Sequence, residues 1–460
     1  MLQWARRKIK RFLPKLFLLK MYYPAISLLA NFFYGQPSEK MIVIGVTGTA
    51  GKSTTVNLIG RILESAGHKV GWTSTLNFKI NNREWINKTK MTMLGKFALQ
   101  KLLKQMVEAG CEYAVIETSS EGAVQSRHLG INYDVFVFTN LSPEHIESHG
   151  SFDNYCAAKG ALFAYLMANK RKIINGHSIE KTKIINLDDK NADYFLNFPS
   201  DKTIGYTLRG NNAHPNFKID KTIKYEQFVL KPSISELKFN GENIKFSLLG
   251  EFNAYNALAA IGTCDIFGIK ASVVKKGLES IKIIPGRLEH IEAGQPFSVV
   301  VDYAHTPEEL EKVYYFLNSV KNSGAKIISV LGSAGGGRDK WKRSELGKLA
   351  ATLTDVVIIT NEDPYDEDPQ KIINEISAGA KSISEPRAKI ILEILDRRLA
   401  IQKAISLAGV GDIIIITGKG SEECIMGPRH TKIPWNDKVV VLELLTPHMG
   451  TIKEFNIFSL

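Results

Sequence analysis

The sequence predicts an α/β protein with two parallel-sheet domains, and three observations support this class. At 460 residues the chain is too long for a single small core. Apolar residues make up 44% and charged residues 23%, which is typical of a globular protein. From residue 41 onward, short β-branched runs alternate with longer stretches of helical periodicity. Such alternation is typical of parallel strands that are covered by helices on both faces.

The first series of elements begins with "MIVIGVTG", which predicts a strand from residue 41. The following stretch, "KSTTVNLIGRILESAG", has its apolar residues at helical spacing. "KVGWTST" predicts a strand, "LGKFALQKLLKQMVEAG" a helix, and "YAVIETSS" and "YDVFVFTNL" two buried strands. Between about residues 200 and 250, polar and apolar residues alternate around the turn "NGEN", which predicts an antiparallel insertion. "NAYNALAAIGTCDIFG" then predicts a helix.

A second α/β series starts near "IIPGRLE". Its predicted strands are "FSVVVDYAH", "KIISVLGS", "DVVIITNEDP" and "GDIIIITGKG", each followed by helical sequence. We therefore expect a basic amphipathic N-terminal segment over 1–40, a central domain over 41–285 and a C-terminal domain over 286–460.

The formal net charge of +12 is compatible with nucleic acid, an anionic membrane surface or phosphorylated substrates. The first twenty residues hold seven Lys or Arg and no acid, so most of the excess lies there. A nucleic-acid footprint would recur along the chain, so we expect no nucleic-acid partner. The four cysteines are scattered without a C-x-x-C pair, which argues against a disulfide scaffold and suits the cytoplasm.

The apolar run "MYYPAISLLANFFYG" is 15 residues long, shorter than the roughly 20 that a membrane-spanning helix needs. No small-residue cleavage site of a signal peptide follows it. Two interpretations stay open: a helical extension packed on the next domain, or a basic amphipathic helix on an anionic membrane surface. In the second, residues 1–35 would make the protein membrane-peripheral.

The stretch "GVTGTAGKSTT" joins the first predicted strand to the first predicted helix. Backbone N–H groups and the helix dipole converge at such a junction and bind phosphate. Lys52 would contact the β/γ-phosphates and Ser53 would offer a hydroxyl to Mg²⁺, with Gly48, Thr49, Gly51 and Thr54 completing the loop. The glycines fall at 45, 48 and 51, which departs from the usual spacing of phosphate loops.

Glu117 ends a predicted strand, where a carboxylate is well placed to hold Mg²⁺. "PEHIESHGSFDNYCAAKG" adds Glu144, His145, Glu147, His149 and Lys159. By composition alone, "EHIESH" is equally compatible with zinc or manganese, and Lys159 with a solvated helix residue.

With these motifs the chain resembles the ATP-dependent Mur ligases of cell-wall synthesis, and most closely their MurE branch. That family carries the shortened loop T-G-T-x-G-K-[ST], a strand-end Glu before Ser-Ser, "TNL…H…HG" and a lysine in "AAK…LF". "GEFNAYNALAAI", "PGRLEHIEAGQPFSVVVDYAHTPEELEKV", "GGGRDKWKR", "DRRLAIQKAI" and "GKGSEE" follow in the family's order.

The resemblance implies a central P-loop ATPase-type parallel-sheet domain followed by a Rossmann-like α/β C-terminal domain. It implies a monomeric ligase that uses ATP and Mg²⁺ to add an amino acid to a muramoyl-dipeptide through an acyl-phosphate, in peptidoglycan synthesis and hence cell shape and division. By similarity Ser53 and Glu117 would bind one Mg²⁺ and His145 a second, and Lys159 would be a carbamylated metal ligand.

Further binding residues are implied only by their match to the family's motifs. For the nucleotide they are Asn253 and Asn256 and, after domain closure, Arg287, Asp302 and His305. For the muramoyl-peptide they are Thr92, Ser119, Gln125 and Arg127.

Two departures from the family bear on the substrate. Diaminopimelate-adding enzymes carry D-N-P-R where this chain has "EDPY", so Tyr365 replaces the arginine and Asp363 lies within the motif. The later G-K-G-H-E appears as "GKGSE", which keeps Gly418 and Glu422. With Asp366 and Glu367 nearby, we expect a cationic amino acid such as lysine. About 40 residues precede the loop, too few for the family's UDP-binding domain. Three alternatives stay open: the remaining domains hold UDP weakly, a partner supplies the UDP site, or the acceptor is lipid-linked and not UDP-linked.

Two other functions stay open. One is a ligase of the polyglutamate or folylpolyglutamate type, against which "SSEGAVQSR" and "DYAHTPEELEKV" argue. The other is a scaffold that binds ATP without ligating, which would need neither metal ligands nor Lys159.

Overall fold

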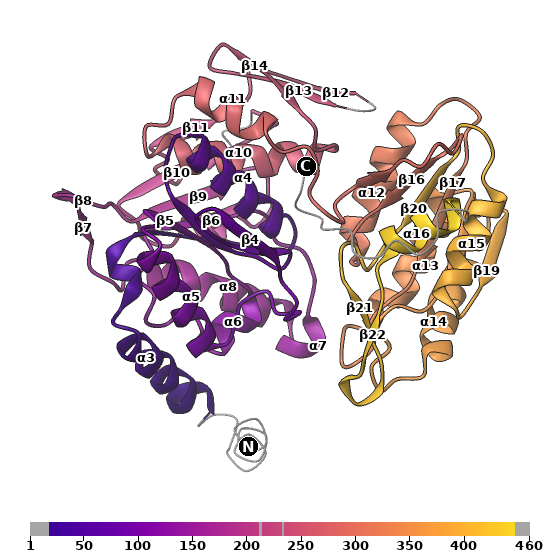
Figure 1. The fold of residues 1–460 in the computed structure, drawn as a ribbon, viewed down its shortest axis with the longest axis horizontal. Coiled ribbons are helices and arrows are strands. Elements are labelled where there is room, and N and C mark those ends of the chain that lie inside the picture. Colours follow the sequence, from indigo (N-terminus) through magenta and orange to yellow (C-terminus); the bar gives the residue numbers. More distant parts are fainter. Residues whose placement is uncertain (1–17, 211–213, 232–233, 447–460) are drawn as a thin grey trace. The chain divides into compact units, whose positions relative to one another are not determined.

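The computed structural model describes residues 18–210, 214–231 and 234–446. The chain divides into two compact units, which comprise residues 1–282 and residues 283–460 (Figure 1). Residues 1–17 of the predicted basic segment lie outside the described residues. The rest of that segment forms a π-helical turn, η1 (Leu18–Tyr22), the helix α3 (Tyr23–Phe33) and a 3₁₀ turn, η2 (Pro37–Lys40). In the described ranges we find no helix whose length and apolar character would let it cross a bilayer.

Within its described residues the first unit contains a nine-stranded sheet of order β11-β10-β9-β6-β1-β5-β2-β3-β4. From β11 to β2 every pairing is parallel, which confirms the predicted fold class. The central strands are buried along their whole length, as expected for a sheet covered on both faces. The strands are β1 (Ile42–Thr47), β2 (Val70–Thr73), β3 (Asn77–Ile80), β4 (Arg83–Ile86), β5 (Tyr113–Glu117), β6 (Val135–Phe138), β9 (Thr182–Asn186), β10 (Lys202–Tyr206) and β11 (Lys221–Ile223).

Helices cover both faces of this sheet, with α4, α10 and α11 on one side and α5, α6 and α8 on the other (Figure 1). The apolar residues of α4 at helical spacing are buried, because they pack on the sheet and on α10 and α11. The helices of this unit after α3 are α4 (Lys52–Ser65), α5 (Lys96–Glu108), α6 (Ser120–Val124), α7 (Ile146–His149), α8 (Phe152–Leu166), α9 (Ala192–Leu196), α10 (Glu251–Asp265) and α11 (Ala271–Glu279).

The predicted antiparallel insertion is present as a separate sheet of β12 (Gln227–Leu230), β13 (Ser235–Phe239) and β14 (Glu242–Phe246). Its turn uses Asn240 and Gly241, both with positive φ, as a tight hairpin requires. The hairpin β3–β4, which was not predicted, extends the main sheet by antiparallel pairing. The signal for it was the polar pair Asn81-Asn82 between two alternating runs. A smaller hairpin joins β7 (Ile173–Ile174) to β8 (His177–Ser178).

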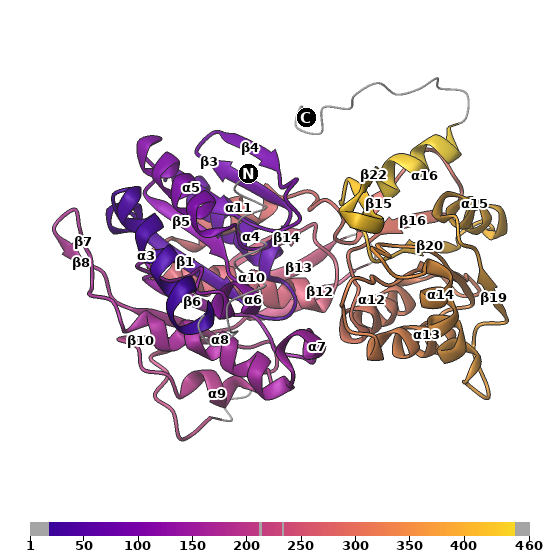
Figure 2. The same ribbon diagram turned by 90° about the horizontal axis from the view of Figure 1, so that it is seen from below.

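Among the described residues of the second unit, a six-stranded sheet has the order β15-β16-β20-β17-β18-β19. Only the β15–β16 pairing is antiparallel. Figure 2 shows α12, α13 and α14 on one side of this sheet and α15 and α16 on the other. The elements are β15 (Glu289–Ile291), β16 (Ser298–Val301), α12 (Pro307–Val320), β17 (Ile327–Leu331), α13 (Trp341–Leu353), β18 (Val356–Ile359), α14 (Pro369–Lys381), β19 (Ile390–Glu393), α15 (Arg397–Leu407), β20 (Ile413–Ile416), β21 (Cys424–Met426), β22 (Lys432–Pro434) and α16 (Asp437–Leu445).

A buried ionic cluster around Asp134 ties the amino ends of three neighbouring strands together. The Asp134 carboxylate accepts hydrogen bonds from the backbone N–H of Val43 in β1 (2.9 Å) and from two lysines, Lys172 (2.5 Å) and Lys181 (3.1 Å). Lys172 also donates to the carbonyl of Met41, just before β1 (2.8 Å). Because Asp134 and Lys181 directly precede β6 and β9, the cluster fixes the register of β1, β6 and β9 from that end.

His128, between α6 and β6, should make the stability of the first unit depend on pH. Burial lowers the pKa of His128 from 6.5 to about 4. Between these values the unfolded chain binds a proton that the folded protein does not, so the free energy of unfolding should fall as the pH falls through this window. The loss should reach about 3 kcal/mol. Urea unfolding at about pH 7 and about pH 4.5 measures it.

The matched variants are His128→Phe, which keeps a ring packed edge-on against Tyr165, and His177→Phe at an exposed site. His128→Phe should flatten the pH dependence and His177→Phe should leave it unchanged. If the free energy of unfolding changed with pH equally in wild type and His128→Phe, the pH dependence would belong to other groups.

Candidate active site

Two glycines let the loop between β1 and α4 lie tightly against its neighbours. Gly51 precedes α4 with φ +79°, a conformation that favours glycine. A Cβ at Gly51 would lie 2.2 Å from Oδ1 of Asn256, and one at Gly48 would lie 1.9 Å from Oγ1 of Thr139. The loop therefore passes so close to its neighbours that larger residues are excluded. Ser53 and Thr54, in the first turn of α4, are buried behind it.

Two residues that follow β6 hold this loop in place, and sequence analysis assigned them no role. Asn140 accepts hydrogen bonds from the N–H of Ala50 through its side chain and from the N–H of Thr49 through its carbonyl, both at 2.9 Å. The Thr139 hydroxyl donates to the carbonyl of Ala50 (2.8 Å). The signal was their place at the end of the strand beside β1, where the carboxyl ends of parallel strands meet.

Ser53 and Glu117 lie together, as the proposed metal site requires. The Ser53 hydroxyl donates to the Glu117 carboxylate (2.7 Å), which is almost fully buried at the end of β5. Thr75, after β2, donates to the same carboxylate through its N–H (2.7 Å) and its hydroxyl (2.9 Å). Sequence analysis missed Thr75, although it follows the strand next to β5. Hydroxyl and carboxylate oxygens are ligands that suit Mg²⁺.

The two predicted lysines both reach the glycine-rich loop. Lys52 donates to the carbonyl of Thr49 (2.5 Å), and Lys159, on α8, donates to the carbonyl of Gly48 (2.7 Å). Lys159 is 2% exposed. Burial, and then the charge of Lys52, hold the pKa of Lys159 well below its ordinary value. A depressed pKa favours the neutral amine, which is the form that reacts with CO₂ to give a carbamate.

The segment "EHIESH" does not form a zinc-type cluster. His145, with φ +56°, precedes α7, and its Nε2 lies 3.3 Å from Oε1 of Glu144. His149 lies 3.2 Å from the hydroxyl of Ser120. In the ranges that the structure describes, no three His, Cys, Asp or Glu side chains gather as metal ligands. The rings of His145 and Tyr155 lie 6.2 Å apart, and Tyr155 is also the ring beneath Lys159.

Asn253 and Asn256 lie on α10, which packs against the glycine-rich loop. Asn256 donates to Oδ1 of Asn253 (3.0 Å), and Asn253 donates to the carbonyl of Leu249 (2.7 Å). Since Asn256 is also the residue that limits the space at Gly51, this pair lies at the amino end of α4.

The residues predicted to hold the muramoyl-peptide form a second group in the first unit. The Thr92 hydroxyl is 3.1 Å from that of Thr75, which binds Glu117, so this group adjoins the Ser53–Glu117 pair. Ser119 caps α6 by accepting the N–H of Gly122. Arg127 donates to Oε1 of Gln125 (2.8 Å) and to the carbonyl of Met93.

In the second unit, Asp302 organises the segment that contains Arg287 and His305. Its carboxylate accepts the N–H groups of Leu288 (2.6 Å) and Ala304 (2.7 Å). Burial raises the pKa of Asp302, and the charge of Arg287 opposes that shift. The guanidinium of Arg287 lies 4.7 Å from the centre of the Tyr303 ring, against which the ring of His305 also packs.

The motifs "EDPY" and "GKGSE" lie together in the second unit, joined by Lys419. This lysine, buried and missed by sequence analysis, donates to Asp363 (2.6 Å) and to Glu422. A Cβ at Gly418 would lie 2.2 Å from Oε2 of Glu362, so the two motifs are in close contact. Tyr365 has φ +53° and its N–H donates to the carbonyl of Met426 (3.0 Å).

The two acids beyond Tyr365 already have protein partners. Asp366 accepts the N–H of Arg429 (2.7 Å), and Glu367 pairs with Arg343 (3.0 Å). Their carboxylates therefore give no direct support to the expected preference for a cationic amino acid.

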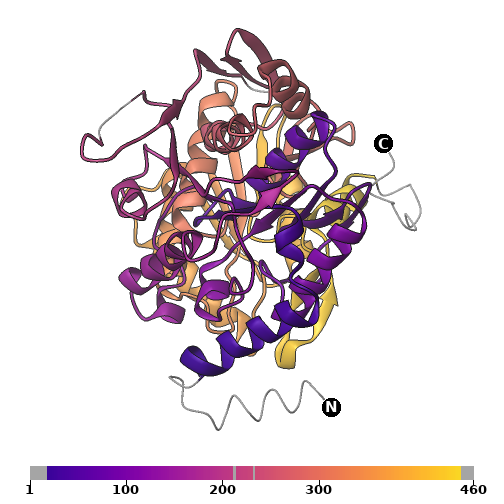
Figure 3. The same ribbon diagram turned by 90° about the vertical axis from the view of Figure 1, so that its left-hand side faces the viewer.

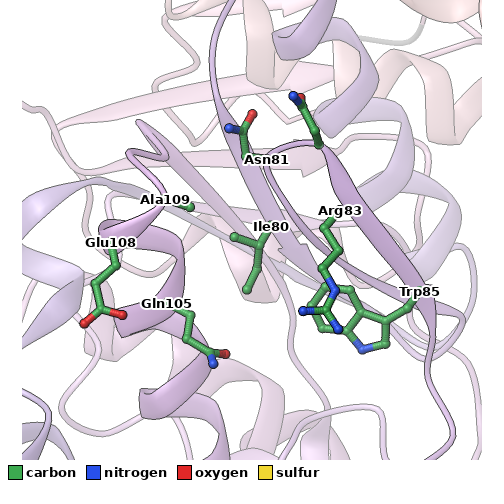
Figure 4. A pocket seen from close by; sticks show the side chains of 8 residues that line it. Ile80, Asn81, Arg83, Trp85, Gln105, Glu108 and Ala109 are labelled. Atoms are coloured by element: carbon green, nitrogen blue, oxygen red, sulfur yellow. The ribbon is translucent and has the colours of Figure 1, made fainter.

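A surface hollow of the first unit lies between the hairpin β3–β4 and the end of α5 (Figure 4). Its lining contains none of the predicted site residues, so we assign it no part in the site. The lining residues are Ile80, Asn81, Asn82, Arg83, Trp85, Gln105, Glu108 and Ala109.

Each of the two units matches a known family model. The family model described as the Mur ligase middle domain matches residues 46–264, and that described as the Mur ligase, glutamate ligase domain matches residues 286–420. The UDP-N-acetylmuramyl-tripeptide synthetase of Roseiflexus sp. (strain RS-1) is 36% identical over 417 residues, covering 90% of this chain and 80% of that protein. The UDP-N-acetylmuramoyl-L-alanyl-D-glutamate–2,6-diaminopimelate ligase of Aquifex aeolicus (strain VF5) is 36% identical over 418 residues, with the same coverage.

Solved structures of two enzymes are similar to this chain in fold. One of a UDP-N-acetylmuramoyl-L-alanyl-D-glutamate–2,6-diaminopimelate ligase matches with a TM-score of 0.57 and 28% identity, covering 90% of this chain and 80% of that chain. The folylpolyglutamate synthase of Mycobacterium tuberculosis matches with a TM-score of 0.65 over 94% of this chain and 96% of that chain. At 16% identity, that second likeness concerns the fold alone.

Proposed function

The chain belongs to the Mur ligase family, and from this we propose that it adds an amino acid to a muramoyl-dipeptide. It is an ATP-dependent ligase that forms amide bonds in peptidoglycan precursor synthesis. The observation that carries the finer proposal is the arrangement of Lys52, Ser53, Glu117 and Lys159 around one glycine-rich loop. We assign residues 41–285 to the middle domain, 286–460 to the C-terminal domain, and the reaction to the cytoplasm, where ATP is made.

The proposed reaction has two steps. A carboxylate oxygen of the acceptor attacks the γ-phosphorus of ATP, the bond to the β,γ-bridging oxygen breaks, and ADP leaves. The amine of the amino acid then attacks the acyl carbon, an amide bond forms, and inorganic phosphate and a proton leave. Negative charge spreads over the transferred phosphoryl group in the first step, so the Lys52 ammonium and the N–H groups at the start of α4 would stabilise it.

Mg²⁺ fits the pair of Ser53 and Glu117, because both offer oxygen ligands that already face each other at 2.7 Å. Bound there, the ion would neutralise charge on the β- and γ-phosphates. His145 is the further ligand that we propose for a second ion.

Carbamylation of Lys159 fits its surroundings. The neutral amine would add to CO₂ and lose a proton, so that a buried neutral group beside Lys52 would become an anion there. That change gives Lys52 a neighbour of opposite charge and supplies carboxylate-like oxygens. The hydrogen bond from Lys159 to Gly48 shows where the amine lies before such a reaction.

For the substrates, we propose that Thr92, Ser119, Gln125 and Arg127 hold the acceptor. Arg127 can pair with an anionic group of that substrate. For the nucleotide we propose Asn253, Asn256, Arg287, Asp302 and His305. For the amino acid we propose Asp363, Tyr365, Gly418 and Glu422, the group that Lys419 joins in the second unit.

The test is phosphate release with ATP, Mg²⁺ and UDP-N-acetylmuramoyl-L-Ala-D-Glu, screened across amino acids that include lysine and diaminopimelate. We expect release that requires both the acceptor and one amino acid, with a ligated product detected by mass spectrometry. Phosphate release that does not depend on the added amino acid would overturn the proposal in favour of an ATP-hydrolysing scaffold. Release with a folate or polyglutamate acceptor in place of the muramoyl-dipeptide would favour the polyglutamate-type ligase.

A further inference from the structure

Helix α3 presents an apolar stripe to the solvent. On one side of α3 and of the turn before it, five large apolar side chains are exposed at helical spacing. Their exposed fractions are 61% for Met21, 54% for Leu28, 53% for Leu29, 77% for Phe32 and 68% for Phe33. No charged residue occurs between Met21 and Ser38. Figure 3 shows α3 as the indigo helix at the lower edge of the first unit. Apolar side chains gathered on one exposed helical face usually mark a site of interaction.

The opposite face of α3 is fastened to the first unit. The Ser27 hydroxyl donates to the carbonyl of Ser126 (2.5 Å), and both Ser27 and Ala30 are buried. The ring centres of Tyr34, which directly follows α3, and Phe97 of α5 lie 6.3 Å apart, and the ammonium of Lys96 lies 4.1 Å from the centre of the Tyr23 ring. The helix is therefore held in one orientation, and that orientation exposes the stripe.

The sequence that leads into the stripe is strongly basic. Seven Lys or Arg and no Asp or Glu occur in residues 1–20, and Lys20, the last of them, is exposed at the start of the apolar run. Positive charge next to an uncharged apolar face is complementary to a surface that is anionic outside and apolar beneath. A second copy of the chain is a poorer fit, because pairing two stripes would bring two basic segments together.

We propose that the apolar stripe of α3 docks on an anionic lipid bilayer. Met21, Leu28, Leu29, Phe32 and Phe33 enter the boundary between headgroups and acyl chains, and the positive charge of Lys20 and of the sequence before it attracts the anionic headgroups. This binding is peripheral, since α3 has 11 residues.

The docking surface adjoins the residues that we propose for the acceptor. Ser126, which accepts the hydrogen bond from Ser27, directly precedes Arg127. Docking through α3 therefore brings the proposed acceptor-binding residues close to the membrane surface, and this consequence rests on the proposed function. The bilayer contact itself does not rest on the proposed function, because it can be measured without any ligase reaction.

The experiment is flotation of the full-length protein with vesicles of phosphatidylcholine, with and without phosphatidylglycerol. Wild type should float with the phosphatidylglycerol vesicles, and high salt should weaken this binding. Leu28→Gln/Phe32→Gln should reduce the floated fraction at least about tenfold. The matched control is Ile173→Gln/Val410→Gln, which removes two equally exposed apolar side chains elsewhere and should float as wild type does. Thermal melting checks that each variant is folded.

Equal flotation of wild type and Leu28→Gln/Phe32→Gln would overturn the proposal, as would failure of the wild type to bind the anionic vesicles. A stripe-dependent doubling of the mass in light scattering, without flotation, would overturn it in favour of self-association. Stronger flotation after deletion of residues 1–17 would overturn the assigned role of the basic residues.

Discussion

Replacing Lys52 with alanine should lower amino-acid-dependent phosphate release by at least about 10³-fold. The ammonium lies at the first residue of α4 and reaches back to the carbonyl of Thr49, so its charge is held at the loop that we propose for the β/γ-phosphates. Alanine keeps the helix and the glycines and removes the ammonium together with its one hydrogen bond to Thr49. The measurement is steady-state phosphate release, with nucleotide affinity determined separately by a fluorescent ATP analogue.

The loss should not reflect unfolding, because the Lys52 side chain makes one hydrogen bond within the loop and is only half-buried. Lys101→Ala, at an exposed position of α5, is the control and should retain full activity. A Lys52→Ala enzyme that folds normally and turns over at the wild-type rate would remove the phosphate-loop assignment.

Replacing Lys159 with alanine should also abolish turnover, and short carboxylic acids such as acetate should recover part of the lost rate. The expectation follows from the buried amine with its depressed pKa, which we propose to be carbamylated. Acetate could enter the space that the truncated side chain leaves and supply the missing carboxylate-like oxygens. The measurement is phosphate release as a function of acetate, propionate and chloride concentration at constant ionic strength.

Lys52→Ala serves as the control here, because acetate adds a negative charge and should not rescue the loss of a cation. A purely structural role for Lys159, through its bond to the Gly48 carbonyl, predicts no rescue. Lack of rescue in a folded variant that still binds ATP would therefore count against carbamylation. Carbon-13 NMR after incubation with labelled bicarbonate should show a carbamate signal in wild type that Lys159→Ala lacks.

The parallel strands could be predicted from sequence because they are buried on both faces and are continuously apolar, as in β1 and β20. The hairpin β3–β4 was missed because no residue of β4 is fully buried and the polar turn resembles an ordinary loop. Alternation over four residues is a weak signal until the neighbouring β2 is known to offer a free edge.

The same distinction applies to the candidate site. The proximity of Ser53 and Glu117 follows from the rule that ligands gather at the carboxyl ends of parallel strands. The contact between Gly51 and Asn256 does not follow from that rule. It depends on how α10 packs on α4, and the two residues are about 200 positions apart in the sequence. Resemblance to a family supplied Asn256, and no spacing within the sequence would have done so. Thr75 and Asn140 needed the strand order, which only the structure provides.

The Asp134 cluster lies at the end of the sheet that is remote from the glycine-rich loop. It joins β1, β6 and β9 at their amino ends, whereas the loop, Thr139 and Asn140 follow the carboxyl ends of β1 and β6. The contacts that align the strands and the residues of the proposed site therefore lie at opposite ends of the strands. Exchange of loops at the carboxyl ends, by evolution or by design, can then change the substrate while the Asp134 cluster keeps the strands aligned.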